Sequence, residues 1–125
     1  MYANNKGSGK MYLLIIILNR EEFLEELMEV LVELGITDAT VTESQSMGKV
    51  LAYEVPIFAG LRFQTKGQRR YSKTILALVD DRQLADEIVQ LLQEMDIDFM
   101  APGVGRIITI KVESALGAPS ELEAE

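Results

Sequence analysis

The 125-residue sequence contains no cysteine, no histidine and no tryptophan. Without cysteine and histidine there is no disulfide, no thiol nucleophile and no Ser-His or Cys-His catalysis. Ordinary zinc and copper sites are excluded for the same reason. Carboxylates are abundant, but no EF-hand spacing arranges them for calcium. Composition alone leaves a carboxylate site for magnesium or calcium open. Our prediction is that the protein has no catalytic residue and no metal site and is not an enzyme.

Long apolar runs are also absent. The run from Met11 to Leu18 has only eight residues, too few to span a membrane, and no signal-peptide cleavage site follows it. We expect a cytoplasmic protein. Residues 1–10 are polar and residues 118–125 are acidic, so both are predicted to be flexible tails on one domain at 11–117.

Positive charge is scarce, because 12 Lys and Arg residues stand against 20 Asp and Glu, for a net charge of −8. This balance argues against nucleic acid as a partner. Half of the basic residues nevertheless fall in one segment, 49–73, which holds a single acid, Glu54. They are Lys49, Arg62, Lys66, Arg69, Arg70 and Lys73. A basic segment in an acidic protein predicts a local anion-binding or partner-binding loop.

Hydrophobic periodicity predicts two strand-helix-strand units. Asn19, with Glu22 three residues later, is expected to cap the first helix. Residues 50–56 are expected to form a second strand arm that leads into a long connection at 57–72. Strands are expected at 12–18, 38–46, 74–79 and 106–113, and helices at 20–34 and 81–95. The order βαββαβ predicts an α+β, ferredoxin-like fold: a four-stranded antiparallel sheet with two helices on one face and a long loop between strands 2 and 3.

The first strand is apolar on both of its faces. Ile15 and Ile17 alternate with Leu14, Ile16 and Leu18. Helices cover only one face of such a sheet, so the second face requires burial by another molecule. We therefore expect the protein to be an oligomer.

A glycine turn, Pro102-Gly103-Val104-Gly105-Arg106-Ile107, runs directly into the last strand. Its two glycines allow a tight bend with exposed backbone N–H groups, and Arg106 adds a permanent positive charge. Such a turn can hold a phosphate. The alternative is a plain connection into a strand, because a lone GxG is a weak motif. Arg106 is then a surface residue at the end of a strand, in an ion pair with an acid of a neighbouring subunit.

Several short motifs together resemble the PII signal-transduction family over about Met11 to Leu116. Glu33-Leu34-Gly35-Ile36 followed by Val41-Thr42-Glu43 is similar to the passage where the family's first helix turns into its second strand. Met47-Gly48-Lys49 matches the entry to the family's T-loop. Gly103-Val104-Gly105-Arg106-Ile107 resembles its B-loop, a glycine turn with a basic residue.

The resemblance implies a homotrimer with a nucleotide site in each cleft between subunits, and it implies no required cofactor. The expected ligand is ATP, ADP or AMP, or a related anion, bound by Gly48, Lys49, Gly103, Gly105 and Arg106. The T-loop, here about residues 50–72, would change shape with the ligand and contact a transporter or an enzyme. Its contacting residues would be Arg62, Lys66, Arg69, Arg70 and Tyr71.

The sequence departs from the family pattern at two places. Val50 stands where the family has a glutamine used for magnesium and 2-oxoglutarate, so we do not expect 2-oxoglutarate sensing. The family's C-loop arginines are absent, since residues 112–117 hold no basic residue. Two alternatives stay open: a CutA-like trimer linked to metal tolerance, and an interaction module that binds no nucleotide.

Overall fold

The computed structural model describes residues 10–63 and 71–118, so the predicted tails fall almost entirely outside it. The strands are β1 (Tyr12–Leu18), β2 (Ala39–Ser44), β3 (Ser72–Val79) and β4 (Gly105–Lys111). The α-helices are α1 (Leu24–Glu33), α2 (Met47–Glu54) and α3 (Leu84–Glu94), with the 3-10 helices η2 (Glu21–Phe23) and η3 (Pro56–Phe63). No helix in this part of the chain is long and apolar enough to cross a membrane.

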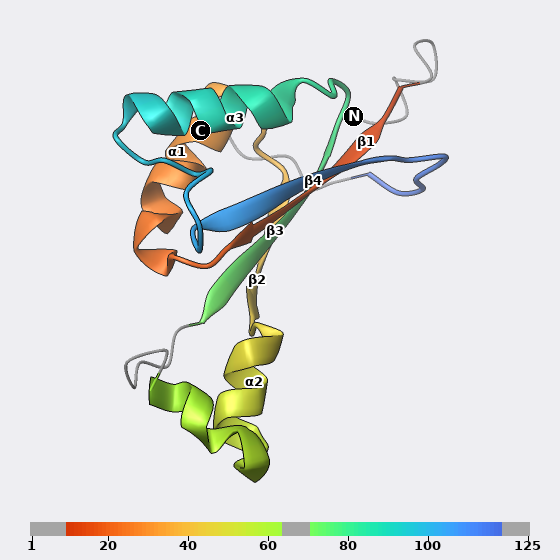
Figure 1. The fold of residues 1–125 in the computed structure, drawn as a ribbon. Helices are drawn as coiled ribbons and strands as arrows, with labels where there is room; N and C mark the ends of the chain where they lie inside the picture. Colours follow the sequence, from red (N-terminus) through yellow and green to blue (C-terminus); the bar gives the residue numbers. More distant parts are fainter. Residues whose placement is uncertain (1–9, 64–70, 119–125) are drawn as a thin grey trace, which may run out of the picture.

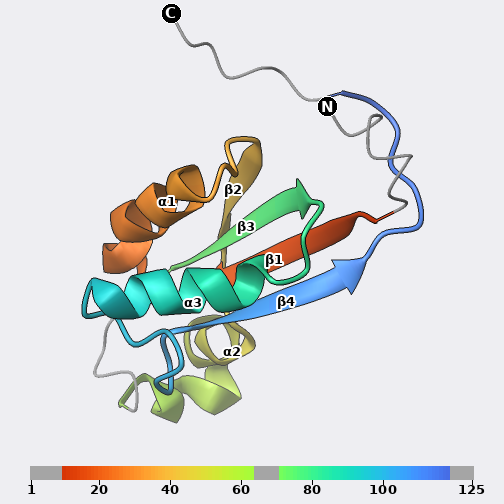
Figure 2. The same cartoon turned by 90° about the horizontal axis from the view of Figure 1, so that it is seen from above.

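The four strands form one antiparallel sheet in the order β2-β3-β1-β4. The helices α1 and α3 lie on one face of this sheet (Figure 1 and Figure 2). The unbroken apolar sequence of β1 suits a strand that is buried within a sheet, and β1 pairs with β3 on one side and β4 on the other. The predicted ferredoxin-like fold is confirmed.

The core fills the space between the sheet and the two helices. Leu14, Ile16 and Leu18 of β1 are almost fully buried, in one cluster with Leu27 of α1 and Ile88 of α3. Both helices repeat apolar residues at three- and four-residue spacing, which places them on a stripe that faces the sheet. Burial of each such side chain contributes about 1.5–3 kcal/mol. This contribution holds the helix layer on the sheet.

The opposite face of the sheet, which we call the open face, is apolar too. Successive side chains of a strand alternate between the two faces. The strand register therefore assigns seven apolar residues to the open face: Leu13, Ile15, Ile17, Leu76, Leu78, Ile108 and Ile110. Both helices of the layer lie on the other side, and α2 projects beyond the strand ends (Figure 1). The apolar pattern predicted on both faces of β1 is confirmed.

The strand arm expected at residues 50–56 is wrong, because α2 covers most of this segment and η3 follows it. Ser46 begins α2: its side-chain oxygen accepts a hydrogen bond from the Lys49 N–H at 3.1 Å. Pro56 ends it, since a residue before proline avoids the helical region, and Val55 is extended (φ −116°, ψ 109°). The first half of the T-loop segment is therefore helical.

Candidate functional site

One end of the sheet gathers the turns that the sequence singles out. Because neighbouring strands are antiparallel, β1 and β2 end where β3 and β4 begin. The register places Leu18 opposite both Lys73 and Gly105, and Ser44 opposite Ser72. The glycine turn and both ends of the T-loop segment therefore lie at this end, which we call the turn end.

The two glycines of the turn are needed for different reasons. Gly103 has φ +85°, a backbone conformation that residues with a side chain rarely adopt. A Cβ at this position would meet no atom within 4 Å. A Cβ on Gly105 would lie 2.5 Å from the carbonyl oxygen of Ile17 and 2.7 Å from Cζ of Phe99. Packing against β1 and Phe99 therefore requires Gly105. Gly103 is the position with open space beside the backbone.

Arg106 is the cation of the glycine turn. Its register partner is Ile17, so its side chain belongs to the open face, together with Ile108 and Ile110. Arg106 is exposed and forms no ion pair with any residue that the structure describes. A guanidinium without a carboxylate partner, at the edge of an apolar face, is available to an anion or to a neighbouring molecule.

Asn19 connects the glycine turn to the exit of the T-loop segment. Its N–H donates to the carbonyl oxygen of Val104 at 2.8 Å, and its side-chain oxygen accepts from the hydroxyl of the buried Ser72 at 2.9 Å. The expected helix cap is wrong, since η2 begins after Arg20 without a side-chain cap. No local sequence signal could reveal the contact with Ser72, because the two residues are 53 positions apart.

Lys49 is buried, with only 8% of its surface exposed. Its Nζ lies 3.1 Å from the centre of the Tyr71 ring in a cation–π contact, and no residue in the described ranges accepts a hydrogen bond from it. A cavity of about 50 Å³ is lined by this pair and by Gln45, Tyr53 and Glu54. The contact joins the first turn of α2 to the residue before β3, and so closes the T-loop segment at its base.

Lys73, the last residue of the basic segment, is engaged by carboxylates. It is hydrogen-bonded and ion-paired with Glu43 on the neighbouring strand, and its Nζ lies 3.9 Å from a carboxylate oxygen of Glu21. The hydrogen bond with Glu43, and the negative charges of Glu43 and Glu21, raise the pKa of Lys73 above its ordinary value. Lys73 is therefore a cross-strand partner of Glu43 rather than an anion ligand.

The other predicted site residues are distributed as follows. Gly48 is exposed on α2, with open space where a Cβ would stand. Arg62 belongs to η3, whereas Lys66, Arg69 and Arg70 lie outside the described residues. The structure thus shows two groups at the turn end, Lys49 with Tyr71 and the glycine turn with Asn19. Their assignment to a nucleotide and to a partner protein stays a prediction.

The sheet order, the helix layer and the long segment between β2 and β3 define an α+β protein of ferredoxin-like plan. Among solved structures, the chain is similar to the crystal structure of Arabidopsis thaliana PII bound to citrate, with a TM-score of 0.53 at 15% sequence identity. The match covers 83% of this chain and 78% of that chain. The chain therefore has a PII-like fold, as its motifs predict. No protein-family model and no curated protein matches its sequence.

Proposed function

We propose that the protein is a PII-like regulator: a homotrimer that binds an adenine nucleotide or a related anion between its subunits and acts on a partner protein through the T-loop segment. The PII-like fold supports this proposal. The observation that carries it is the position of Arg106, an unpaired cation within the described chain. Arg106 stands next to the glycine turn and at the edge of the apolar open face.

The open face supports the trimer. Its seven apolar side chains come from three neighbouring strands and form one continuous surface, and large exposed apolar surfaces on soluble proteins mark interaction sites. Leu76 and Ile110, at 37% and 44% exposure, are the residues of this surface that gain most from being covered. When further copies of the chain cover it, Arg106 borders a neighbouring subunit, and the ligand cleft lies between two chains.

Phosphate chemistry suits the turn end. The guanidinium of Arg106 can bind two phosphate oxygens at once, and the open space at Gly103 lets a ligand approach the backbone. Citrate, the ligand named with Arabidopsis thaliana PII, is also an anion. In this proposal Gly105 allows the turn to pack closely against β1, and Gly103 and Arg106 contact the ligand.

Lys49 gives the ligand a route to the T-loop segment. A phosphate is a stronger partner for an ammonium than an aromatic ring is. A bound nucleotide therefore competes with Tyr71 for Nζ of Lys49 and loosens the base of the segment when it wins. Two helices of this region, α2 and η3, expose large apolar side chains: Met47 of α2 at 77% and Ile57 of η3 at 83%. These two side chains are the proposed apolar contacts for a partner protein.

Calorimetric titration with ATP, ADP, AMP and cyclic AMP tests the ligand. We expect saturable binding of at least one, weakened at least about tenfold by Arg106→Ala, because a charge-assisted hydrogen bond is lost. Arg20→Ala is the matched control, since Arg20 is also a guanidinium at the turn end but is already paired with Glu22 at 2.6 Å. A folded oligomer that binds none of the four contradicts the nucleotide proposal.

Light scattering tests the assembly. We expect a mass near three chains of 14.0 kDa, and a single-chain mass for Leu76→Glu, which puts a charge on the open face. The matched control is Leu13→Met, an apolar exchange on the same face. A wild-type protein of 14.0 kDa in solution removes the cleft between subunits.

An interaction module without a nucleotide is the second candidate. Two observations favour it. Gly105 is required for packing, and Lys49 is buried against Tyr71, so the presence of Gly105 and Lys49 has a structural reason that needs no ligand. A trimer that fails to bind nucleotide supports this candidate. For the CutA-like alternative, the described residues offer no group of three or more Asp or Glu side chains placed to hold a metal ion.

A further inference from the structure

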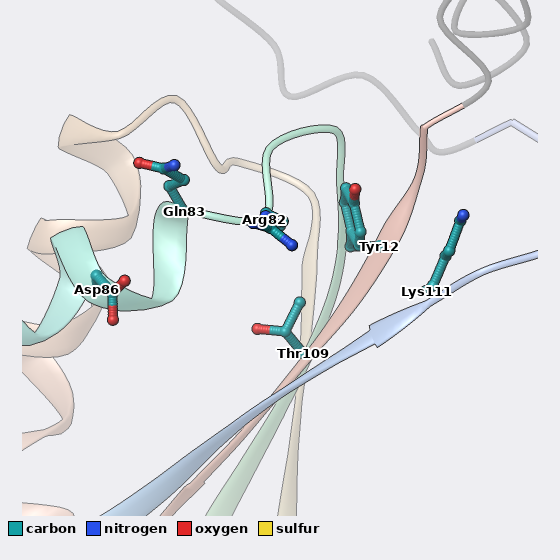
Figure 3. A pocket seen from close by; sticks show the side chains of 6 residues that line it. All are labelled: Tyr12, Arg82, Gln83, Asp86, Thr109 and Lys111. Atoms are coloured by element: carbon teal, nitrogen blue, oxygen red, sulfur yellow. The ribbon is translucent and has the colours of Figure 1, made fainter.

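A second cavity lies at the opposite end of the sheet from the glycine turn. Its volume is about 600 Å³, within the usual range for small-molecule sites. Among the described residues, six line it: Tyr12, Arg82, Gln83, Asp86, Thr109 and Lys111. Figure 3 shows that they come from β1, from β4, from the residues just before α3 and from its first turn. We call this cavity the α3 groove and this end of the sheet the groove end.

The α3 groove exists because β1 and β4 run on past the N-terminus of α3, as Figure 2 shows. The side chains on the helix-covered face change character there. Leu14 and Ile107 lie under the helices, whereas Thr109 and Lys111 of β4, on the same face, are exposed. Tyr12 is the register partner of Lys111. The strands form the floor of the groove, and the first turn of α3 forms its wall.

The groove brings together two cations, Arg82 and Lys111. Arg82 and Lys111 form no ion pair with any residue in the described ranges, although the chain has a net charge of −8. In Figure 3 the side chain of Arg82 extends from the loop before α3 toward the strands, with Tyr12 between it and Lys111. The guanidinium of Arg82 can bind a phosphate or carboxylate group directly, and the ammonium of Lys111, on the other side of Tyr12, adds to the positive potential of the groove.

The remaining lining groups suit hydroxyl groups. Asp86 is a carboxylate that accepts hydrogen bonds, Gln83 both donates and accepts, and the hydroxyls of Tyr12 and Thr109 do the same. An apolar ligand would leave all of these groups desolvated and unpaired. A simple inorganic anion would leave Asp86 facing its negative charge.

We propose that the α3 groove binds a small polyhydroxylated anion. Its phosphate or carboxylate group lies against Arg82, on the α3 side of Tyr12, and its hydroxyl groups donate to Asp86 and bond to Gln83. Lys111, on the other side of Tyr12, adds positive potential to the groove. This site is separate from the nucleotide cleft proposed at the turn end, because the two lie at opposite ends of β4.

Calorimetry with three probes tests the proposal on the full chain: ribose 5-phosphate, gluconate and inorganic phosphate. We expect saturable binding of ribose 5-phosphate, gluconate or both, and the pattern shows whether phosphate or carboxylate is preferred. Arg82→Gln is expected to weaken it at least about tenfold, and Lys111→Gln, which removes a longer-range attraction, about threefold. Arg20→Gln is the matched control, because it removes the same charge at the other end of the sheet, where Arg20 is paired with Glu22, and it should leave affinity within about twofold.

Asp86→Asn separates a polyol site from a general anion site. We expect it to weaken the polyol anion several-fold and to leave inorganic phosphate unchanged or slightly tighter, because it removes a negative charge. Shifts of the Thr109 and Lys111 amide signals in nuclear magnetic resonance spectra should locate the ligand. The proposal is overturned when neither polyol anion binds, when binding ignores both cations, or when inorganic phosphate binds equally well. None of these results bears on nucleotide binding, which Arg106→Ala reports at the turn end.

Discussion

At the turn end Lys49 lies under the ring of Tyr71 and Lys73 is paired with Glu43, whereas at the groove end Arg82 and Lys111 have no such partner in the described chain. Lys49 and Lys73, the two ends of the basic segment of the sequence, belong to the first of these ends. The comparison teaches that a cluster of basic residues along the chain does not show which cations are accessible. Contacts with an aromatic ring and with a cross-strand carboxylate determine it instead.

The largest effect at the turn end is expected from Gly105→Ala. A Cβ at 2.5 Å from the carbonyl oxygen of Ile17 forces a backbone shift in β1 or β4. We expect urea denaturation to show a loss of about 3 kcal/mol in the free energy of unfolding. Gly103→Ala is the control, because only its positive φ is strained, at about 1 kcal/mol. Equal losses for the two variants would contradict the packing role of Gly105.

The next effect concerns the buried ammonium of Lys49. A double-mutant cycle with Lys49→Met and Tyr71→Leu is expected to give a coupling energy of about 1–2 kcal/mol, since the ring compensates a desolvated charge. Denaturant unfolding of the four proteins measures it. The same cycle with Lys111→Met in place of Lys49→Met should give no coupling, because Lys111 lies at the groove end. A coupling energy of zero between Lys49 and Tyr71 would contradict the conclusion that the turn end holds its cation in a stabilising contact and the groove end does not.

Asn19→Ala is expected to cost about 1 kcal/mol, because the buried hydroxyl of Ser72 loses its partner. Adding Ser72→Ala to Asn19→Ala should recover part of the loss, since no orphaned hydroxyl remains. Thermal unfolding of the single and double variants checks this order. A double variant less stable than Asn19→Ala would show that Ser72 is held by other contacts.

The smallest effect is a pH dependence from Lys73. Its pKa is raised in the folded state, so the stabilisation by Glu43 is complete below the ordinary value of 10.5 and is lost as the pH rises through the higher folded-state value. Thermal unfolding on either side of pH 10.5 should show a steeper loss for the wild type than for Glu43→Gln. A profile unaffected by Glu43→Gln would contradict the pairing.

The sequence predicts the frame of the fold well because its signals are local or periodic. The unbroken apolar run of β1, the three- and four-residue spacing in α1 and α3, and the alternation in β2 all have the predicted structure. The apolar open face follows from the same alternation. The α2 helix was missed because residues 50–56 fit a strand as well as a helix, and the deciding cap lies earlier, at Ser46.

The sites are less predictable, because tertiary structure brings their residues together. The glycine turn was recognisable, but the reason for Gly105 is a carbonyl on another strand. The α3 groove joins Tyr12, Arg82 and Lys111, which are remote in sequence and meet only through the strand register. One local signal was present: β4 changes from isoleucine to threonine and lysine at alternate positions of the helix-covered face.

The pairing of Ser44 with Ser72 has a consequence for how this architecture can vary. Residues 45–71 connect two paired residues of neighbouring strands, Ser44 and Ser72. They therefore form an insertion whose two ends are held next to each other by the sheet. Closing a longer loop costs little, about 0.6 kcal/mol for each doubling of its length. Descendants of such a chain can exchange the insert, and with it the molecules they recognise, while the frame folds as before.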